Sequence, residues 1–145
     1  MVSGVLEESA LIEAIMMTRT QIDFLWQVFI TVHIAVFAML FIYGKSVDDL
    51  KLSVRTFAAL GMAAFEWING KALTAAYLLL DAMQDQYRAA FGQPERFQPK
   101  FYEQFVLAQY SDRPNMVLMT HGTILFVVAT ALVARKLIQN VGSDG

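Results

Sequence analysis

The chain contains no cysteine and few charged residues. Without cysteine among its 145 residues, it has no disulfide scaffold and no zinc or iron–sulfur site with thiolate ligands. Charged residues make up 17% of the chain, against about 25% in an average soluble domain. The net charge of −2 gives no basic surface for nucleic acid. Composition therefore argues against an ordinary soluble enzyme and against a nucleic-acid-binding protein.

Proline is also scarce, and hydrophobic residues are abundant. The three prolines, Pro94, Pro99 and Pro114, all fall within residues 92–115, so long stretches on either side contain no helix breaker. Hydrophobic residues make up 57% of the chain and are concentrated in three runs. About 20 apolar residues in a helix cross a hydrocarbon layer of about 30 Å. The sequence therefore predicts an all-α fold: an integral membrane bundle of three helices.

The predicted spans cover residues 22–43, 57–80 and 116–136. In the first, the 20 residues from Phe24 to Tyr43 include only three that are not apolar. The third contains no formal charge until it ends at Arg135 and Lys136. The second carries Glu66, Asn69 and Lys71 at its centre, and a core helix of a soluble protein is the competing interpretation there.

The second helix is expected to be longer than a membrane is thick. Its pattern stays helical from about residue 51 to about residue 91, where Gly92 supplies a stop and Pro94 discourages a restart. A helix of that length extends about 60 Å, roughly twice the hydrocarbon thickness. We therefore expect it to protrude from the membrane, with Asp81, Asp85 and Arg88 on a solvated face.

Two segments outside the spans are amphipathic. Residues 1–21 either form a helix at the interface or continue into the first span, and an interfacial lead-in is the favoured interpretation. Residues 92–115 are rich in aromatics, and Pro99 suits the start of a short helix that ends near Tyr110. We expect that short amphipathic helix to lie on the bilayer surface before the third span.

Polar residues inside the predicted spans are the candidate functional residues. A charge near the centre of a bilayer is costly, so Glu66 and Lys71 need partners on other helices. Depth along an antiparallel hairpin places His33 level with Glu66, and it places His121 near Lys71 and closest to Thr74. The full candidate set, as contacts or as the lining of a pathway, is Glu66, Asn69, Lys71, His33, His121 and Thr31.

A haem group is a third possibility, with His33 and His121 as axial ligands. The same depth arithmetic puts the two histidines about 6 Å apart along the membrane normal, which is further than one haem iron allows. We expect no cofactor and no metal, and the sequence shows no nucleophile–base signature and no phosphate-binding glycine loop.

The composition and the polar residues together favour a non-enzymatic membrane protein. The first hypothesis is an oligomer-forming or complex-embedded subunit, in contact with lipid and with copies of itself or other membrane subunits, whose intramembrane polar residues fix helix contacts. The alternative is a homo-oligomeric ion channel or proton-conducting module lined by Glu66, Asn69, Lys71 and His33. The expected location is a multi-pass integral membrane one, the inner membrane if the source is bacterial.

Overall fold

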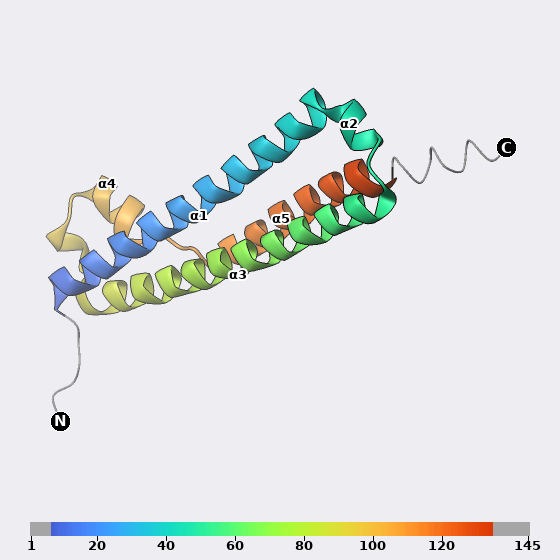
Figure 1. Ribbon diagram of the computed structural model, residues 1–145. Helices are drawn as coiled ribbons and strands as arrows, with labels where there is room; N and C mark the ends of the chain where they lie inside the picture. Colours follow the sequence, from blue (N-terminus) through green and yellow to red (C-terminus); the bar gives the residue numbers. More distant parts are fainter. Residues whose placement is uncertain (1–6, 135–145) are drawn as a thin grey trace.

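The computed structural model describes residues 7–134, and the regular elements in that range are all helical (Figure 1). The prediction of an all-α fold is confirmed. The α-helices are α1 (Glu8–Ile42), α2 (Gly44–Asp48), α3 (Leu52–Phe91), α4 (Pro99–Phe101) and α5 (Arg113–Ala129). A 3-10 turn at Pro94–Arg96 precedes α4, and π-helical turns follow α4 at Tyr102–Val106 and α5 at Thr130–Ala134.

The three long helices form an elongated bundle in which α3 is central. It packs against α1 on one side and α5 on the other, and it runs antiparallel to both (Figure 1). With 40 residues, α3 extends about 60 Å. It ends at Gly92, where a Cβ atom would lie 2.5 Å from the carbonyl oxygen of Arg88, so glycine is required at this turn.

The N-terminal segment continues into the first hydrophobic run without a break. Because α1 begins at Glu8 and runs to Ile42, residues 8–21 follow the second of the two expected possibilities and continue into the first hydrophobic run, and residues 1–6 lie outside the described residues. The buried positions Leu11, Ile15 and Ile22 share a hydrophobic cluster with Leu80 of α3. This packing keeps the segment on the bundle as part of one 35-residue helix.

The connection from α3 to α5, residues 92–112, folds back over one end of the bundle, and we call it the cap. Its helical part ends at Val106 rather than near Tyr110. Val106 is fully buried in the cluster that contains Leu11, Ile15 and Tyr87. The cap is therefore attached to α1 and α3 through a hydrophobic core of its own.

Polar side chains of α3 hold the cap's backbone. Arg88 donates from Nε to the Val106 carbonyl and from Nη2 to the Ala108 carbonyl, each at 3.1 Å. Asp81 accepts a 2.7 Å hydrogen bond from the Tyr110 amide. The expectation that Asp81, Asp85 and Arg88 form a solvated face is therefore wrong for Asp81 and Arg88, because the cap's backbone groups take the place of water.

Within the described residues, two helices are long and apolar enough to cross a membrane: Glu8–Ile42 and Arg113–Val133. The central helix α3 is not among them, since the polar residues at its centre lower its hydropathy. The end of the third predicted span, residues 135–136, lies outside the described residues.

Candidate functional site

Four polar side chains from the three long helices meet midway along the bundle. They are each 4–5% exposed: His33 from α1, Glu66 and Asn69 from α3, and His121 from α5. We call this set the central polar cluster. It contains four of the six candidate residues from the sequence and connects all three helices.

His33 and Glu66 form a buried contact between α1 and α3. The Nε2 atom of His33 lies 2.6 Å from Oε1 of Glu66, and Nδ1 of His33 lies 2.7 Å from the carbonyl oxygen of Phe29. A carbonyl oxygen only accepts, so Nδ1 is the donor in this bond. The Phe29 carbonyl therefore orients the imidazole ring with Nε2 toward the carboxyl group of Glu66.

His121 of α5 is held in a similar way, with a backbone carbonyl at one ring nitrogen and a side chain of α3 at the other. Its Nδ1 donates to the Val117 carbonyl over 2.9 Å, and its Nε2 lies 2.9 Å from Oδ1 of Asn69. The Asn69 amide nitrogen donates to the Leu25 carbonyl over 3.3 Å, which fixes the orientation of the amide. Asn69 thereby connects α3 to His121 of α5 on one side of its amide and to the backbone of α1 on the other.

The Glu66 carboxylate lies between the two imidazoles. Its Oε2 atom is 3.9 Å from Nε2 of His121, while its Oε1 atom contacts His33. The Phe29 ring packs against both histidines, with ring centroids 4.3 and 4.4 Å away. The cluster thus runs across the bundle, perpendicular to the helix axes, and the Phe29 ring covers both histidines.

Helical periodicity explains which candidates enter the cluster. Glu66 and Asn69 begin a buried stripe that continues along α3 through Leu73, Ala76 and Leu80 at spacings of three and four residues. Lys71 is two residues from Asn69 and therefore points away from this stripe, to the exposed surface. Thr31 is likewise two residues from His33 and is exposed. These two candidates lie outside the cluster.

The predicted depth of His121 is wrong. The depth arithmetic started the third helix at Met116 and placed His121 closest to Thr74, but α5 begins at Arg113. Those three residues correspond to about 4.5 Å. His121 instead contacts Asn69, and its ring lies 3.3 Å from where a Cβ atom on Gly70 would be. Gly70 therefore allows the histidine ring to approach α3 closely.

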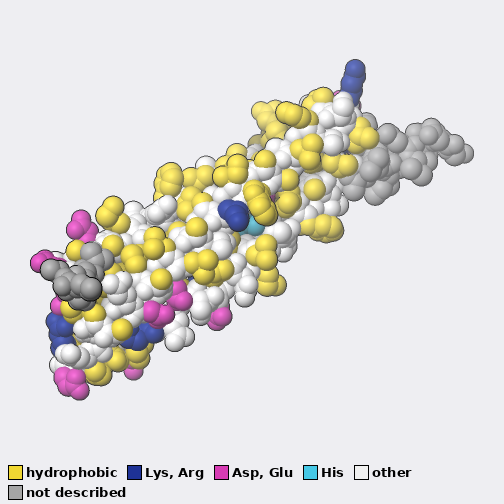
Figure 2. Space-filling model, turned by 90° about the horizontal axis from the view of Figure 1, so that it is seen from below, with side chains coloured by type: hydrophobic (Ala, Val, Ile, Leu, Met, Phe, Trp, Pro, Cys, Tyr) yellow, Lys and Arg dark blue, Asp and Glu magenta, His cyan; other side chains and the backbone are white. Residues whose placement is uncertain are grey.

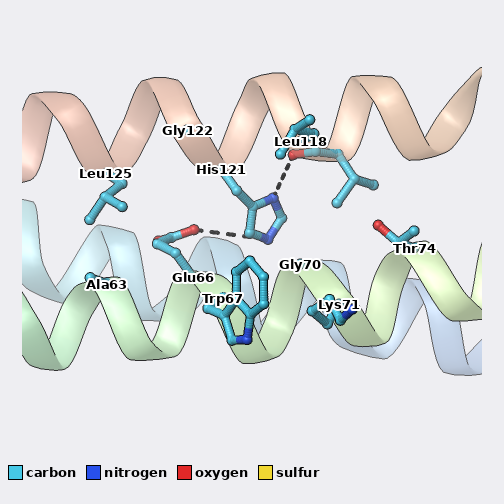
Figure 3. A pocket seen from close by; sticks show the side chains of 11 residues that line it. Ala63, Glu66, Trp67, Gly70, Lys71, Thr74, Leu118, His121, Gly122 and Leu125 are labelled. Atoms are coloured by element: carbon cyan, nitrogen blue, oxygen red, sulfur yellow. Dashed lines mark hydrogen bonds and ion pairs between the residues drawn. The ribbon is translucent and has the colours of Figure 1, made fainter.

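A groove between α3 and α5 leads from the central polar cluster to the surface (Figure 3). Its cavity volume is about 210 Å³. Glu66 and His121 form its buried floor, and the exposed Trp67 and Lys71 stand on its α3 side. The Lys71 ammonium lies 5.4 Å from the centroid of the Trp67 ring, a cation–π contact.

The two histidines do not fit a haem group in this arrangement. Both Nε2 atoms point to the carboxylate of Glu66 or to Asn69, and the Phe29 ring fills the space beside both rings. A porphyrin between them would have to displace Glu66 and Phe29. In the part of the chain that the structure describes, no group of three or more histidine, aspartate or glutamate side chains is placed to hold a metal ion.

A second polar site, which sequence reasoning missed, fixes the start of α1 to the cap. Glu8 Oε2 is 2.8 Å from Arg96 Nη2, and the Tyr87 hydroxyl donates to Glu8 Oε1 over 3.1 Å. The hydrogen bond from Arg96 lowers the pKa of Glu8, and the same bond raises the pKa of Arg96. Burial raises the pKa of Tyr87. Partners about 80 residues apart in sequence leave no local pattern that could have indicated this site.

Arg55 is a further buried charge that the sequence did not single out. It is 1% exposed near the end of the bundle opposite the cap, and its Nη2 donates to the Ala131 carbonyl over 3.3 Å. The same atom lies 3.6 Å from Asp48 Oδ1. The acceptor belongs to the π-helical turn at Thr130–Ala134, where the regular hydrogen-bond pattern of α5 ends. Arg55 therefore holds the end of α5 against α3.

Comparisons of the chain with models of known protein families, with curated proteins and with solved structures gave no significant match.

Proposed function

We propose that the chain is a multi-pass membrane subunit whose three long helices cross the bilayer and are fixed to one another by the central polar cluster. In this proposal it works without catalysis, as part of a homo-oligomer or of a larger membrane complex. The observation that carries the proposal is an inverted distribution of polarity along the middle of the bundle.

We use the name middle section for the three long helices beyond the part that the cap covers. The exterior of this section is hydrophobic. Figure 2 shows hydrophobic side chains spread along one face, with most acidic and basic groups gathered at one end. Large apolar residues of all three long helices are at least 62% exposed: Phe24, Ile34, Phe41, Phe57, Trp67, Leu118, Met119 and Phe126. Water would penalise such a surface, whereas lipid tails or partner helices would cover it without cost.

The interior of the same section is polar. His33, Glu66, Asn69 and His121 are buried there and paired with each other. In a bilayer the hydrophobic effect does not drive helices together, so interhelical hydrogen bonds and close packing determine the contacts. The cluster supplies one polar link from α3 to each neighbouring helix. In this proposal these links fix the contacts between the helices.

The geometry favours this role over conduction. The polar groups of the cluster succeed one another across the bundle, from α1 through α3 to α5, and Lys71 and Thr31 lie outside it. A pathway for ions along the bundle axis would need polar groups at several depths. We therefore expect a single chain to conduct neither ions nor protons.

The test combines membrane extraction with flux measurements. Membranes from cells that express the chain are washed with alkaline carbonate, and the protein is expected to stay in the pellet. After purification in mild detergent with lipids retained, its size should exceed that of one chain. Reconstituted liposomes should show proton and cation flux at the background of protein-free liposomes.

Two outcomes would contradict the proposal. Release of the protein by carbonate would mean that its helices do not cross the bilayer. Proton flux that is abolished by Glu66→Gln but unchanged by Glu95→Gln would mean that the cluster conducts. The second substitution is a matched control, because Glu95 is exposed in the cap, far along the chain from the cluster.

A further inference from the structure

The groove between α3 and α5 has open space above the central polar cluster. Its walls are apolar and include Ala63, Leu118 and Leu125. Gly122 on α5 leaves the groove open, since nothing lies within 4 Å of the position that its Cβ atom would occupy. A volume of about 210 Å³ is below the usual range of about 300–1,000 Å³ for whole ligands. It suits a compact head group whose tail lies outside.

The floor of the groove lacks a hydrogen-bond donor. Oε2 of Glu66 is buried and accepts no hydrogen bond from the residues that the structure describes. The nearby Nε2 of His121 is 3.9 Å away and is directed to Asn69 at 2.9 Å. A buried carboxylate oxygen without a donor is costly, so a ligand hydroxyl would find a strong acceptor here.

The rim of the groove carries a cation without an anionic partner. Lys71 has no carboxylate partner among residues 7–134, and its ammonium lies against the Trp67 ring. Trp67 is itself 69% exposed and offers a flat aromatic face beside the ammonium. A ring oxygen of a ligand could accept from Lys71 while the ring lies near Trp67.

From these groups we infer that the groove binds the head group of a lipid-soluble quinol. One hydroxyl donates to Oε2 of Glu66, the oxygen at the other end of the ring accepts from the Lys71 ammonium, and the apolar tail runs along the hydrophobic exterior. The inference rests on the proposed membrane location, because the tail needs lipid. It concerns binding, and it assigns no electron transfer to the chain.

Fatty acids and sterols match the groove less well. A fatty acid would bring a second carboxylate beside Glu66, and like charges repel strongly in such an environment. A sterol carries one hydroxyl and would leave either Glu66 or Lys71 without a partner. The quinol satisfies both ends of the groove with one rigid ring.

The test uses the tryptophan at the rim as the reporter. The chain has two tryptophans, so Trp26→Phe leaves Trp67 alone. This protein, inserted in lipid nanodiscs, is titrated with decylubiquinol kept reduced by ascorbate, and we expect a saturable change in fluorescence. Lys71→Met should weaken binding about tenfold by removing a charged donor. Oleate and cholesterol should not compete.

A matched pair of glycine substitutions separates blocking from misfolding. Gly122→Leu should abolish the saturable signal by filling the groove. Gly61→Leu should leave the signal unchanged, since Gly61 also has open space around its Cβ position but does not line the groove.

The inference is overturned if inserted protein with native circular dichroism gives no saturable signal, if Gly122→Leu binds like Gly61→Leu, or if oleate competes as well as the quinol. Each of these results leaves the proposed membrane subunit intact. If the chain does not insert into bilayers at all, both proposals fail, and carbonate extraction identifies that case.

Discussion

The cap end and the middle of the bundle distribute polarity in opposite ways. At the cap end, Leu11, Ile15 and Val106 form a hydrophobic core, and ion pairs such as Glu8–Arg96 lie at the surface. In the middle, large hydrophobic side chains face outward, and the buried centre is Glu66 with its two histidines. One chain thus combines the pattern of a water-soluble domain with the reverse pattern.

Both α1 and α3 therefore have one half with a hydrophobic core and one half with a polar core. Both helices contribute to the cap core with one half and to the central polar cluster with the other. The inverted half is the basis for the proposed membrane location. The cap half needs water around its charges, so it should lie outside the bilayer in that proposal.

The largest expected effect on stability comes from removing the Glu66 carboxylate from the central polar cluster. Glu66→Ala would leave His33 without its partner in the interior and should lower the free energy of unfolding by about 3–5 kcal/mol. Thermal unfolding in detergent, followed by circular dichroism, measures the loss. The control Glu95→Ala removes an exposed carboxylate of the cap and should change stability by no more than about 0.5 kcal/mol. Equal melting temperatures for the two variants would contradict the structural role of the cluster.

A smaller loss of stability is expected when a side chain of the hydrophobic core at the cap end is shortened. Leu11→Ala removes a side chain that is 1% exposed and should cost about 3 kcal/mol. Leu60→Ala changes an exposed leucine of the middle section and should cost less than about 0.5 kcal/mol in detergent. Urea unfolding in detergent compares the two, and a larger loss for Leu60 would mean that its face packs against another chain.

The smallest expected effect is the dependence of the cap end's local stability on pH. The pKa of Glu8 is lowered by its hydrogen bond with Arg96, so the folded state holds the ionised form more strongly than the unfolded state. This contribution is present above the ordinary value of 4.5 and is lost as the pH falls through the lower folded pKa. The protection factors of amides near Glu8, which are exchange rates corrected for the intrinsic effect of pH, should therefore fall below pH 4.5.

Glu8→Gln should remove most of that pH dependence, and added salt should reduce it, because the pair is exposed to solvent. The middle section contains none of the groups in this pair. Protection factors that fall equally in the wild type and in Glu8→Gln would show that another group is responsible.

The sequence predicted the helical content because hydrophobic runs and helix stops are local signals. The end of α3 at Phe91 follows from Gly92, and its length follows from the absence of proline before Pro94. The end of the short helix in the cap was predicted too late. Its position depends on Arg88 binding the carbonyls of Val106 and Ala108, which is a contact between distant segments.

The candidate site was predictable in part for the same reason. His33 and Glu66 lie at nearly equal distances from the predicted ends of the first two spans, and the structure brings the two side chains into contact. His121 follows a long connection, and an error of three residues in the start of α5 misplaced it. Lys71 was included as a charge at the centre of a predicted span, while the buried stripe of α3 leaves it exposed at the rim of the groove.

The continuity of α3 has a mechanical consequence. It is one helix without proline. Arg88 of this helix donates hydrogen bonds to the cap, and Glu66 lies about 33 Å further along the same helix. A helix of this kind has no hinge at which rotation could be absorbed. A torque on the cap that turns α3 about its axis would therefore turn Glu66 relative to its two histidines at the same time.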